Sequence, residues 1–158
     1  MEVKIRQGSK TDFNAVFEVN QLAFGQDNGA KLVNLLRNSS AFIPELSLVA
    51  TQGKKIIGHI LFTKIQIVNS VSKTESLALA PMAVNPEFQN KGIGRQLVQH
   101  RIRKARELQY QSIIVLGHTN YYPRFGFLPA DKWNIKAPYD VPSNVLWRLN
   151  LRQTDLKM

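Results

Sequence analysis

The fold is decided by the stretch Met82-Ala83-Val84-Asn85-Pro86-Glu87-Phe88-Gln89-Asn90-Lys91-Gly92-Ile93-Gly94-Arg95. An aliphatic strand ends in this stretch, a loop follows, and a long helix begins at the glycines. The first N–H groups of a helix have no partner inside the helix, and the helix dipole adds partial positive charge there. The stretch therefore predicts an anion site, in which Gly92 and Gly94 let a pyrophosphate approach the backbone and Lys91 and Arg95 add charge.

Two common phosphate-binding motifs do not fit this loop. A P-loop needs Gly-Lys-Ser/Thr at the second glycine, whereas this chain has Gly94-Arg95-Gln96. A Rossmann fingerprint needs a third glycine where Leu97 stands, and an acidic residue after the next strand, where the chain has Leu116-Gly117-His118. What remains is Gln-x-x-Gly-x-Gly between an aliphatic strand and an amphipathic helix, which is more specific than a bare Gly-x-Gly.

Hydrophobic periodicity outward from this loop predicts a mixed sheet with helices packed against it, an α/β or α+β fold. Ser9 or Thr11 is expected to cap the first helix, Gly53 to form a tight turn, and Pro81 to cause a bulge because it lacks a backbone donor. The expected strands are Val3–Arg6, Ser47–Thr51, Lys54–Ile67, Ser76–Val84, Ser112–Leu116 and Val145–Leu151. The expected helices are Asp12–Ala23, Gly29–Arg37 and Gly92–Leu108, with a brief helical turn at Asn120–Phe125.

The length of 158 residues suits one domain, which we expect to span residues 1–152 before a short tail at 153–158. No repeat, linker or long apolar run is visible, and Met1–Arg6 is typical of a strand and not of a signal peptide. The expected compartment is therefore the cytoplasm, without a membrane anchor. The absence of cysteine excludes disulfides and thiolate metal sites, and the three histidines show no metal-ligand spacing, so no metal is expected.

The formal net charge of +10 favours an anionic partner. Nucleic acid and a phosphorylated cofactor such as coenzyme A both satisfy that requirement. Several basic residues lie along the helix after the loop, where a solvated face is the expected arrangement: Arg95, Arg101, Arg103, Lys104 and Arg106. No signature of a nucleic-acid-binding module accompanies them, so nucleic acid is not the expected partner.

Four segments together resemble the GNAT superfamily of N-acetyltransferases. Gln89-Asn90-Lys91-Gly92-Ile93-Gly94 resembles the acetyl-CoA signature of the superfamily, and Met82–Phe88 resembles the strand and turn that lead into it. Tyr122-Pro123-Arg124-Phe125-Gly126-Phe127 resembles the Tyr-x-x-x-Gly-Phe motif, and Ile57–Phe62 is also typical. The resemblance covers nearly the whole chain and is greatest to the YhbS-like branch of acetyltransferases.

The resemblance implies a splayed strand pair, here Ser76–Val84 and Ser112–Leu116, that holds acetyl-CoA as a cosubstrate. The pantetheine arm would pair with backbone groups of Met82, Ala83 and Val84. The pyrophosphate would accept hydrogen bonds from the backbone N–H groups of the loop. The cofactor-binding residues expected there are Gln89, Asn90, Lys91, Gly92, Ile93, Gly94 and Arg95.

Acetyl transfer to an amine needs a deprotonated amine, a donor to the oxyanion and an acid for the leaving thiolate. The resemblance places Tyr122 as the general acid and suggests the N–H of Met82 as the oxyanion donor. Candidate bases are His118, which follows the strand Ser112–Leu116, and Glu45, which precedes the strand Ser47–Thr51. His59 and Glu75 are further candidates, and a water relay is the alternative.

The expected reaction is direct transfer of an acetyl group to a primary amine of a small molecule or peptide. An acceptor motif is not apparent, although the positive charge favours a neutral or acidic amine over a polyamine. Two other functions stay open at this point: a catalytically silent acyl-CoA sensor and, less favoured, a basic nucleic-acid-binding protein. GNAT domains often dimerise, so a homodimer is also an open expectation.

Overall fold

The computed structural model describes residues 2–117, 121–137 and 145–151. The strands are β1 (Lys4–Gln7), β2 (Phe42–Gln52), β3 (Lys55–Val68), β4 (Lys73–Val84), β5 (Ser112–Leu116), β6 (Leu128–Pro129) and β7 (Leu146–Asn150). The α-helices are α1 (Phe13–Phe24), α2 (Asn28–Arg37) and α3 (Ile93–Glu107). Short 3₁₀ helices occur at Lys10–Asp12, Pro86–Phe88, Tyr122–Phe125 and Ala130–Trp133.

The strands form one mixed sheet of seven strands in the order β1-β2-β3-β4-β5-β7-β6. β1 pairs with β2 and β2 with β3 in antiparallel fashion, whereas β4 and β5 are parallel, with Leu77 opposite Ile113. β7 is antiparallel to both β5 and β6. The mixed sheet and its helices confirm the fold class predicted from the sequence.

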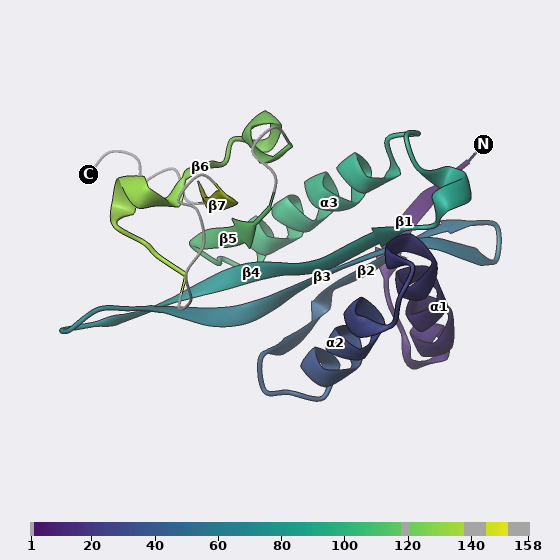
Figure 1. Cartoon of the computed structure of the whole chain (residues 1–158), viewed down its shortest axis with the longest axis horizontal. Coiled ribbons are helices and arrows are strands. Elements are labelled where there is room, and N and C mark those ends of the chain that lie inside the picture. Colours follow the sequence, from purple (N-terminus) through teal and green to yellow (C-terminus); the bar gives the residue numbers. More distant parts are fainter. Residues whose placement is uncertain (1, 118–120, 138–144, 152–158) are drawn as a thin grey trace. The chain divides into compact units, whose positions relative to one another are not determined.

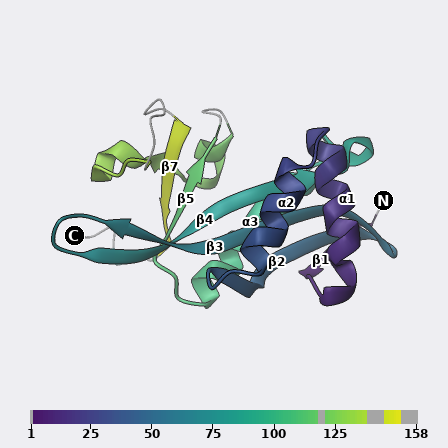
Figure 2. The same ribbon diagram turned by 60° about the horizontal axis from the view of Figure 1, so that its bottom comes forward.

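The chain forms two compact units, residues 1–63 with 80–104 and residues 64–79 with 105–158. In the first unit, α1 and α2 lie on one face of β1–β3, and α3 lies on the opposite face (Figure 1). Figure 2 shows α1 and α2 side by side across the same strands. Helices therefore cover both faces of the sheet in this unit.

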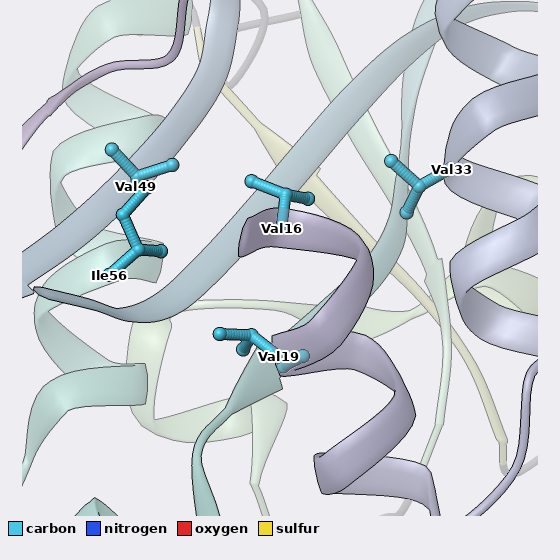
Figure 3. Close-up of a cluster of buried hydrophobic side chains, with 6 residues drawn as sticks. Val16, Val19, Val33, Val49 and Ile56 are labelled. Atoms are coloured by element: carbon cyan, nitrogen blue, oxygen red, sulfur yellow. The ribbon is translucent and has the colours of Figure 1, made fainter. Parts of the chain in front are cut away.

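Aliphatic side chains from both helices and from the sheet make the core beneath α1 and α2. Val16 and Val19 of α1 and Val33 of α2 pack with Val49 of β2 and Ile56 of β3 (Figure 3). Ala83 of β4 belongs to the same cluster. The strand that precedes the glycine loop is thus fixed against both helices.

Gly58 of β3 allows α3 to pack closely on the other face of the sheet. A Cβ placed on Gly58 would lie 3.2 Å from Cδ1 of Leu97 and 3.4 Å from both Cβ of Ala50 and the carbonyl oxygen of Ala83. Leu97, Val98, Ile102 and Ala105 form the buried apolar face of α3, as their spacing predicts. The position of the helix that follows the loop is therefore determined by close contact with β3.

Arg101 departs from the expected solvated face of α3. Its side chain is fully buried, Nη2 donates to the carbonyl oxygen of Ile60 at 3.1 Å, and the guanidinium lies 5.0 Å from the centroid of the Phe62 ring. The expectation was wrong at this residue because Arg101 stands four residues after Leu97, on the same face of the helix. Arg95, Arg103 and Arg106 are exposed as expected.

An ion pair fixes the start of α1. Nη1 and Nη2 of Arg6 donate to the two carboxylate oxygens of Asp12 at 2.7 and 2.9 Å, and the backbone N–H of Ser9 donates to Oδ2 of Asp12 at 2.8 Å. Ser9 caps the 3₁₀ turn at Lys10–Asp12, and Asp12 itself is the N-cap of α1. The hydrogen bond from Arg6 lowers the pKa of Asp12 from its ordinary value of 3.8 to about 2.

We expect Asp12→Asn to lower the free energy of unfolding by about 1–3 kcal/mol near pH 6, the value of hydrogen bonds to a charged group. Because the pKa of Asp12 is lowered in the folded state, its stabilising effect is complete above pH 3.8 and is lost as the pH falls through about 2. Urea unfolding should show a difference from the wild type that shrinks between pH 4 and pH 2. Glu2→Gln is the control, since its pair with Lys4 is solvent-exposed at 3.7 Å. A difference that is constant across this pH range contradicts the prediction.

The second unit contains the parallel strand pair and the C-terminal strands. Oγ of Ser76 lies 2.8 Å from Oγ of Ser112 and donates to its carbonyl oxygen at 3.1 Å, which joins β4 to β5. Ile114 packs with Ala130 and Leu146 in a small apolar core. This unit carries the segment that resembles the Tyr-x-x-x-Gly-Phe motif.

The observed elements match most of the expected ranges. β2 begins at Phe42, well before Ser47, with an irregular register between these two residues. The short strand β6 and the 3₁₀ turn that follows it were not expected. The expected bulge at Pro81 and the splayed strand pair stay predictions, and the expected tail at 153–158 lies outside the described residues. No helix in the described ranges is long and apolar enough to cross a membrane.

Candidate functional site

Two side-chain amides hold the loop between β4 and α3 in shape. Oδ1 of Asn85 accepts a hydrogen bond from the N–H of Glu87 at 3.0 Å, and the N–H of Asn85 donates to the carbonyl oxygen of Ile57 on β3 at 2.8 Å. Nε2 of Gln89 donates to the carbonyl oxygen of Val84 at 3.0 Å. The side chain of the motif glutamine therefore closes the loop onto the end of β4, and its backbone N–H donates to the carbonyl oxygen of Pro86 at 3.4 Å.

The backbone that leads into α3 turns through two left-handed residues. Asn90 has φ 64° and Gly92 has φ 81°, both in the left-handed region. The carbonyl oxygen of Gly92 accepts the N–H of Gln96 at 3.1 Å, so the helix begins directly after this glycine. The N–H groups of Ile93, Gly94 and Arg95 then belong to the first turn, where a helix offers its donors to an anion.

Basic side chains surround this helix start, and its first turn has no acidic residue. Lys91 and Arg95 are exposed, as the sequence predicts. The ammonium groups of Lys91 and of Lys55 lie 5.8 and 5.4 Å from the centroid of the Phe88 ring. The sequence did not predict that Lys55, the first residue of β3, contributes charge here, because only the fold brings it beside the loop.

Tyr122 lies in the second unit at the start of the 3₁₀ turn Tyr122–Phe125. Its half-buried ring forms edge-on contacts with Tyr121 and Phe127 at centroid distances of 5.3 and 5.7 Å. Burial, and secondarily the charge interaction with Tyr121, raise the pKa of the Tyr122 phenol above its ordinary value of 10.0. The hydroxyl therefore keeps its proton across the neutral range, as a general acid requires.

Gly117 lies against the ring of Tyr122. A Cβ at Gly117 would lie 3.1 Å from the hydroxyl oxygen and would overlap the ring edge. Gly117 is itself fixed, because its N–H donates to the carbonyl oxygen of Val145 at 2.8 Å and its own carbonyl accepts Nε1 of Trp147 at 3.4 Å. The place of Tyr122 therefore depends on the absence of a side chain at the end of β5.

The candidate bases fall in different environments. His118 lies outside the described residues. Glu45 is exposed in the irregular part of β2, and Glu75 is exposed on β4. His59 is 1% exposed, and burial followed by the charges of Arg101 and Arg37 lowers its pKa to about 3. A buried imidazole with so low a pKa is a poor general base near neutral pH.

A buried polar group around His59 was not anticipated from the sequence. Nε2 of His59 lies 3.3 Å from Oγ of Ser47, while Nδ1 is buried without a hydrogen-bond partner. On the opposite face of the sheet, Nε and Nη1 of Arg101 are also buried, with no hydrogen-bond partner among the described residues. The helical spacing of Arg101 was the signal that could have revealed its burial.

In the part of the chain that the structure describes, no three His, Asp or Glu side chains are grouped as metal ligands would be. The donor set at the start of α3 is instead one of backbone N–H groups and cationic side chains. Such donors suit a multiply charged phosphate ester. The fold and this loop define a domain in which a sheet strand leads into a helix start whose donors suit an anion.

Sequence comparison assigns the domain to a family. Residues 13–127 match the Acetyltransferase (GNAT) family, and the chain belongs to it. It is 40% identical over 134 residues to an uncharacterized N-acetyltransferase of Escherichia coli K12, YjhQ, covering 84% of this chain and 74% of YjhQ. It is 32% identical over 106 residues to the E. coli N-acetyltransferase YhbS, covering 66% of this chain and 61% of YhbS. The resemblance to GNAT acetyltransferases is thereby confirmed.

Solved structures agree with this assignment. The crystal structure of E. coli YhbS in complex with CoA has a TM-score of 0.89 at 25% identity, covering 99% of this chain and 85% of that one. A GNAT acetyltransferase from Brucella melitensis in complex with acetyl-CoA has a TM-score of 0.77 at 26% identity, covering 94% and 88% of the two chains. Relatives with this fold thus bind CoA or its acetyl ester.

Proposed function

We propose that this protein is an acetyl-CoA-dependent N-acetyltransferase that transfers the acetyl group directly to a primary amine of a small molecule or peptide. The observation that carries the proposal is the pre-shaped start of α3, with its left-handed Gly92, a first turn without acidic residues, and the exposed Lys91 and Arg95 beside it. That loop lies in a chain of the GNAT family, and two of its structural neighbours contain CoA or acetyl-CoA.

The cofactor would be held mainly by the main chain. Backbone N–H groups from Gln89 to Arg95 would donate to the pyrophosphate, with Lys91 and Arg95 adding charge at the rim. Backbone groups of Met82, Ala83 and Val84 would pair with the pantetheine arm as an added strand does. The expected splay of β4 from β5 would provide room for that arm.

Acetyl-CoA supplies an activated acyl group, and the protein must manage protons and charge around it. The backbone N–H of Met82 would donate to the carbonyl oxygen as negative charge develops there. Tyr122 would give its proton to the departing thiolate, since its reference pKa lies slightly above that of a thiol. Glu45, His118 or a relayed water would take the proton of the amine.

Calorimetric titration of the full chain with acetyl-CoA and with CoA tests the proposal at its first step. We expect saturable binding of both ligands, together with an increase in Tm that grows with ligand concentration. Binding should weaken as salt rises, because the basic rim attracts a charged ligand. Absence of binding for both ligands would contradict the proposed function.

Thiol release across a panel of primary amines then separates an enzyme from a silent acyl-CoA sensor. An enzyme releases free CoA at a rate that depends on the amine, and mass spectrometry finds the acetylated amine. A sensor binds acetyl-CoA in the calorimeter but yields no amine-dependent thiol. DNA or RNA binding that is sensitive to salt, without any effect of acetyl-CoA on Tm, would instead favour the nucleic-acid alternative.

A further inference from the structure

Arg37, the last residue of α2, is held in a fixed orientation. Its guanidinium carbon lies 3.6 Å from the centroid of the Phe13 ring, at the start of α1. Nη1 donates to Oδ1 of Asn34 at 2.8 Å, one turn earlier on α2. The side chain is half-buried, so a ligand in solution can reach a cation whose geometry is already set.

No carboxylate in the described ranges lies within 4.0 Å of the Arg37 guanidinium. Burial alone lowers its pKa, since no acidic group raises it. Arg6 differs, because both of its terminal nitrogens bind the carboxylate of Asp12. The buried Arg101 also has no carboxylate partner in the described ranges, and it donates to the carbonyl oxygen of Ile60 instead. Arg37 differs from both, because it has no acid partner there and is only half-buried.

Arg37 continues the face of α2 that lies on the sheet. It stands four residues after Val33, and residues at this spacing share a helix face. Val33 packs in the cluster that contains Val49 and Ala83. Ala83 is part of the segment proposed to pair with the pantetheine arm, so Arg37 lies about one helical turn further along the same covered face.

The neighbouring polar group on this face is uncharged or positive. His59 stands opposite Val49 in the β2–β3 register, so both side chains are on the face beneath α1 and α2. Burial, and then the charges of Arg101 and Arg37, lower the pKa of His59, which keeps the ring neutral. Its buried Nδ1 has no hydrogen-bond partner, and Nε2 faces Oγ of Ser47.

We propose that Arg37 binds a carboxylate of the acceptor, so that the acceptor is a small amine that also carries a carboxylate. This inference rests on the proposed N-acetyltransferase function. A planar guanidinium pairs with a carboxylate through two parallel hydrogen bonds. Nη1 of Arg37 is bound to Asn34, so the pair would use Nε and Nη2. The positive charge of Arg37 itself opposes a polyamine that lacks an acidic group.

Kinetics with matched acceptors test the proposal. Amino acids are compared with their amides, and tripeptides with Asp or Glu at the second position with their Asn or Gln counterparts. For wild-type protein we expect kcat/KM to favour the carboxylate-bearing member of each pair. Arg37→Gln should lower kcat/KM for that member about 10- to 100-fold, the loss of one charge-assisted pair, and leave the neutral member within about threefold.

Two variants control for non-specific effects. Arg37→Lys should recover part of the lost preference, because the charge remains while the planar fork is lost. Arg103→Gln removes an exposed arginine of α3 and should leave both members of each pair unaffected. If the tripeptides show the preference and the free amino acids do not, the carboxylate belongs to a peptide and the small-amine form of the proposal is overturned.

Binding without turnover separates this proposal from the proposed function. The CoA-saturated protein is titrated with N-acetylglycine and with N-acetylglycinamide while NMR follows the Arg37 Nε–Hε and His59 ring signals. We expect saturable shifts of both signals with N-acetylglycine and not with N-acetylglycinamide. In Arg37→Gln, the His59 ring signals should not shift with either compound. Equal responses to both compounds, or none, overturn the carboxylate site. CoA binding without any amine-dependent thiol release contradicts the proposed function. The NMR titration does not depend on turnover, so it still tests the carboxylate site in that case.

Discussion

Tyr122→Phe is expected to lower kcat by about 10² or more, within the usual range for loss of a general acid. The ring contacts of Tyr122 with Tyr121 and Phe127 do not involve the hydroxyl, so phenylalanine should preserve them. Because burial raises the pKa of the phenol, the wild-type enzyme should keep this proton well above neutral pH. Steady-state thiol release at saturating acetyl-CoA measures the effect.

Tyr121→Phe is the matched control for this prediction. Tyr121 packs on Phe125 and lies under the guanidinium of Arg124, contacts that a phenylalanine ring also makes. We expect its kcat to stay within a few-fold of wild type, and the affinity of both variants for CoA to be unchanged. If Tyr122→Phe keeps full turnover while Tyr121→Phe is inactive, the acid is the neighbouring tyrosine.

Gly117→Ala offers a second way to displace the Tyr122 hydroxyl. The added Cβ would overlap the Tyr122 ring, so either the ring or the end of β5 must shift. Loss of kcat with an intact phenol at position 122 would connect catalysis to the placement of the hydroxyl. The fluorescence-monitored unfolding midpoint of this variant shows whether the fold has been kept.

Gly92→Ala is the second substitution with a large expected effect, and it should raise the Kd for CoA about 10- to 100-fold. In the protein alone, a Cβ at Gly92 meets nothing closer than Nη2 of Arg95 at 4.0 Å. The free protein therefore has room for the methyl group, which would occupy the space through which a phosphate approaches the helix start. The loss corresponds to one or two weakened charge-assisted hydrogen bonds.

The change also places a Cβ on a residue with φ 81°, which costs about 1–2 kcal/mol of stability. Gly25→Ala separates these two effects. Gly25 ends α1 with φ 66°, and a Cβ there meets nothing within 4 Å. We expect both variants to lose similar unfolding free energy, while Gly25→Ala binds CoA as the wild type does. Equal affinities for CoA in the two variants would contradict the role given to the loop.

The sequence predicts where the strand ends and α3 begins, because these boundaries depend on local rules. Left-handed backbone favours glycine and asparagine, which stand at positions 92 and 90 of the loop. The helix starts and strand ends follow from periodicities of 3.6 and 2 residues. β5 also has the predicted bounds, because residues 112–116 form a short, mostly aliphatic run.

Features that depend on residues far apart in the chain were not predicted. Arg101 was assigned to the solvated face because arginine is rarely buried, although its position in the helix already indicated otherwise. Lys55 reaches the loop only because β3 pairs beside β4 in the sheet. The stack of Arg37 on Phe13 joins the two ends of a helical hairpin, which no local pattern reveals.

Gln89 and Asn85 hold the loop after β4 closed through hydrogen bonds to the protein itself. A receptor already assembled in this way needs little conformational ordering when its ligand arrives. The association rate for CoA should then be governed by diffusion and by attraction to the protein's field, falling steeply with ionic strength. Stopped-flow traces should accordingly be single-exponential with a rate linear in ligand concentration, while Gln89→Ala should introduce a slower, saturating phase.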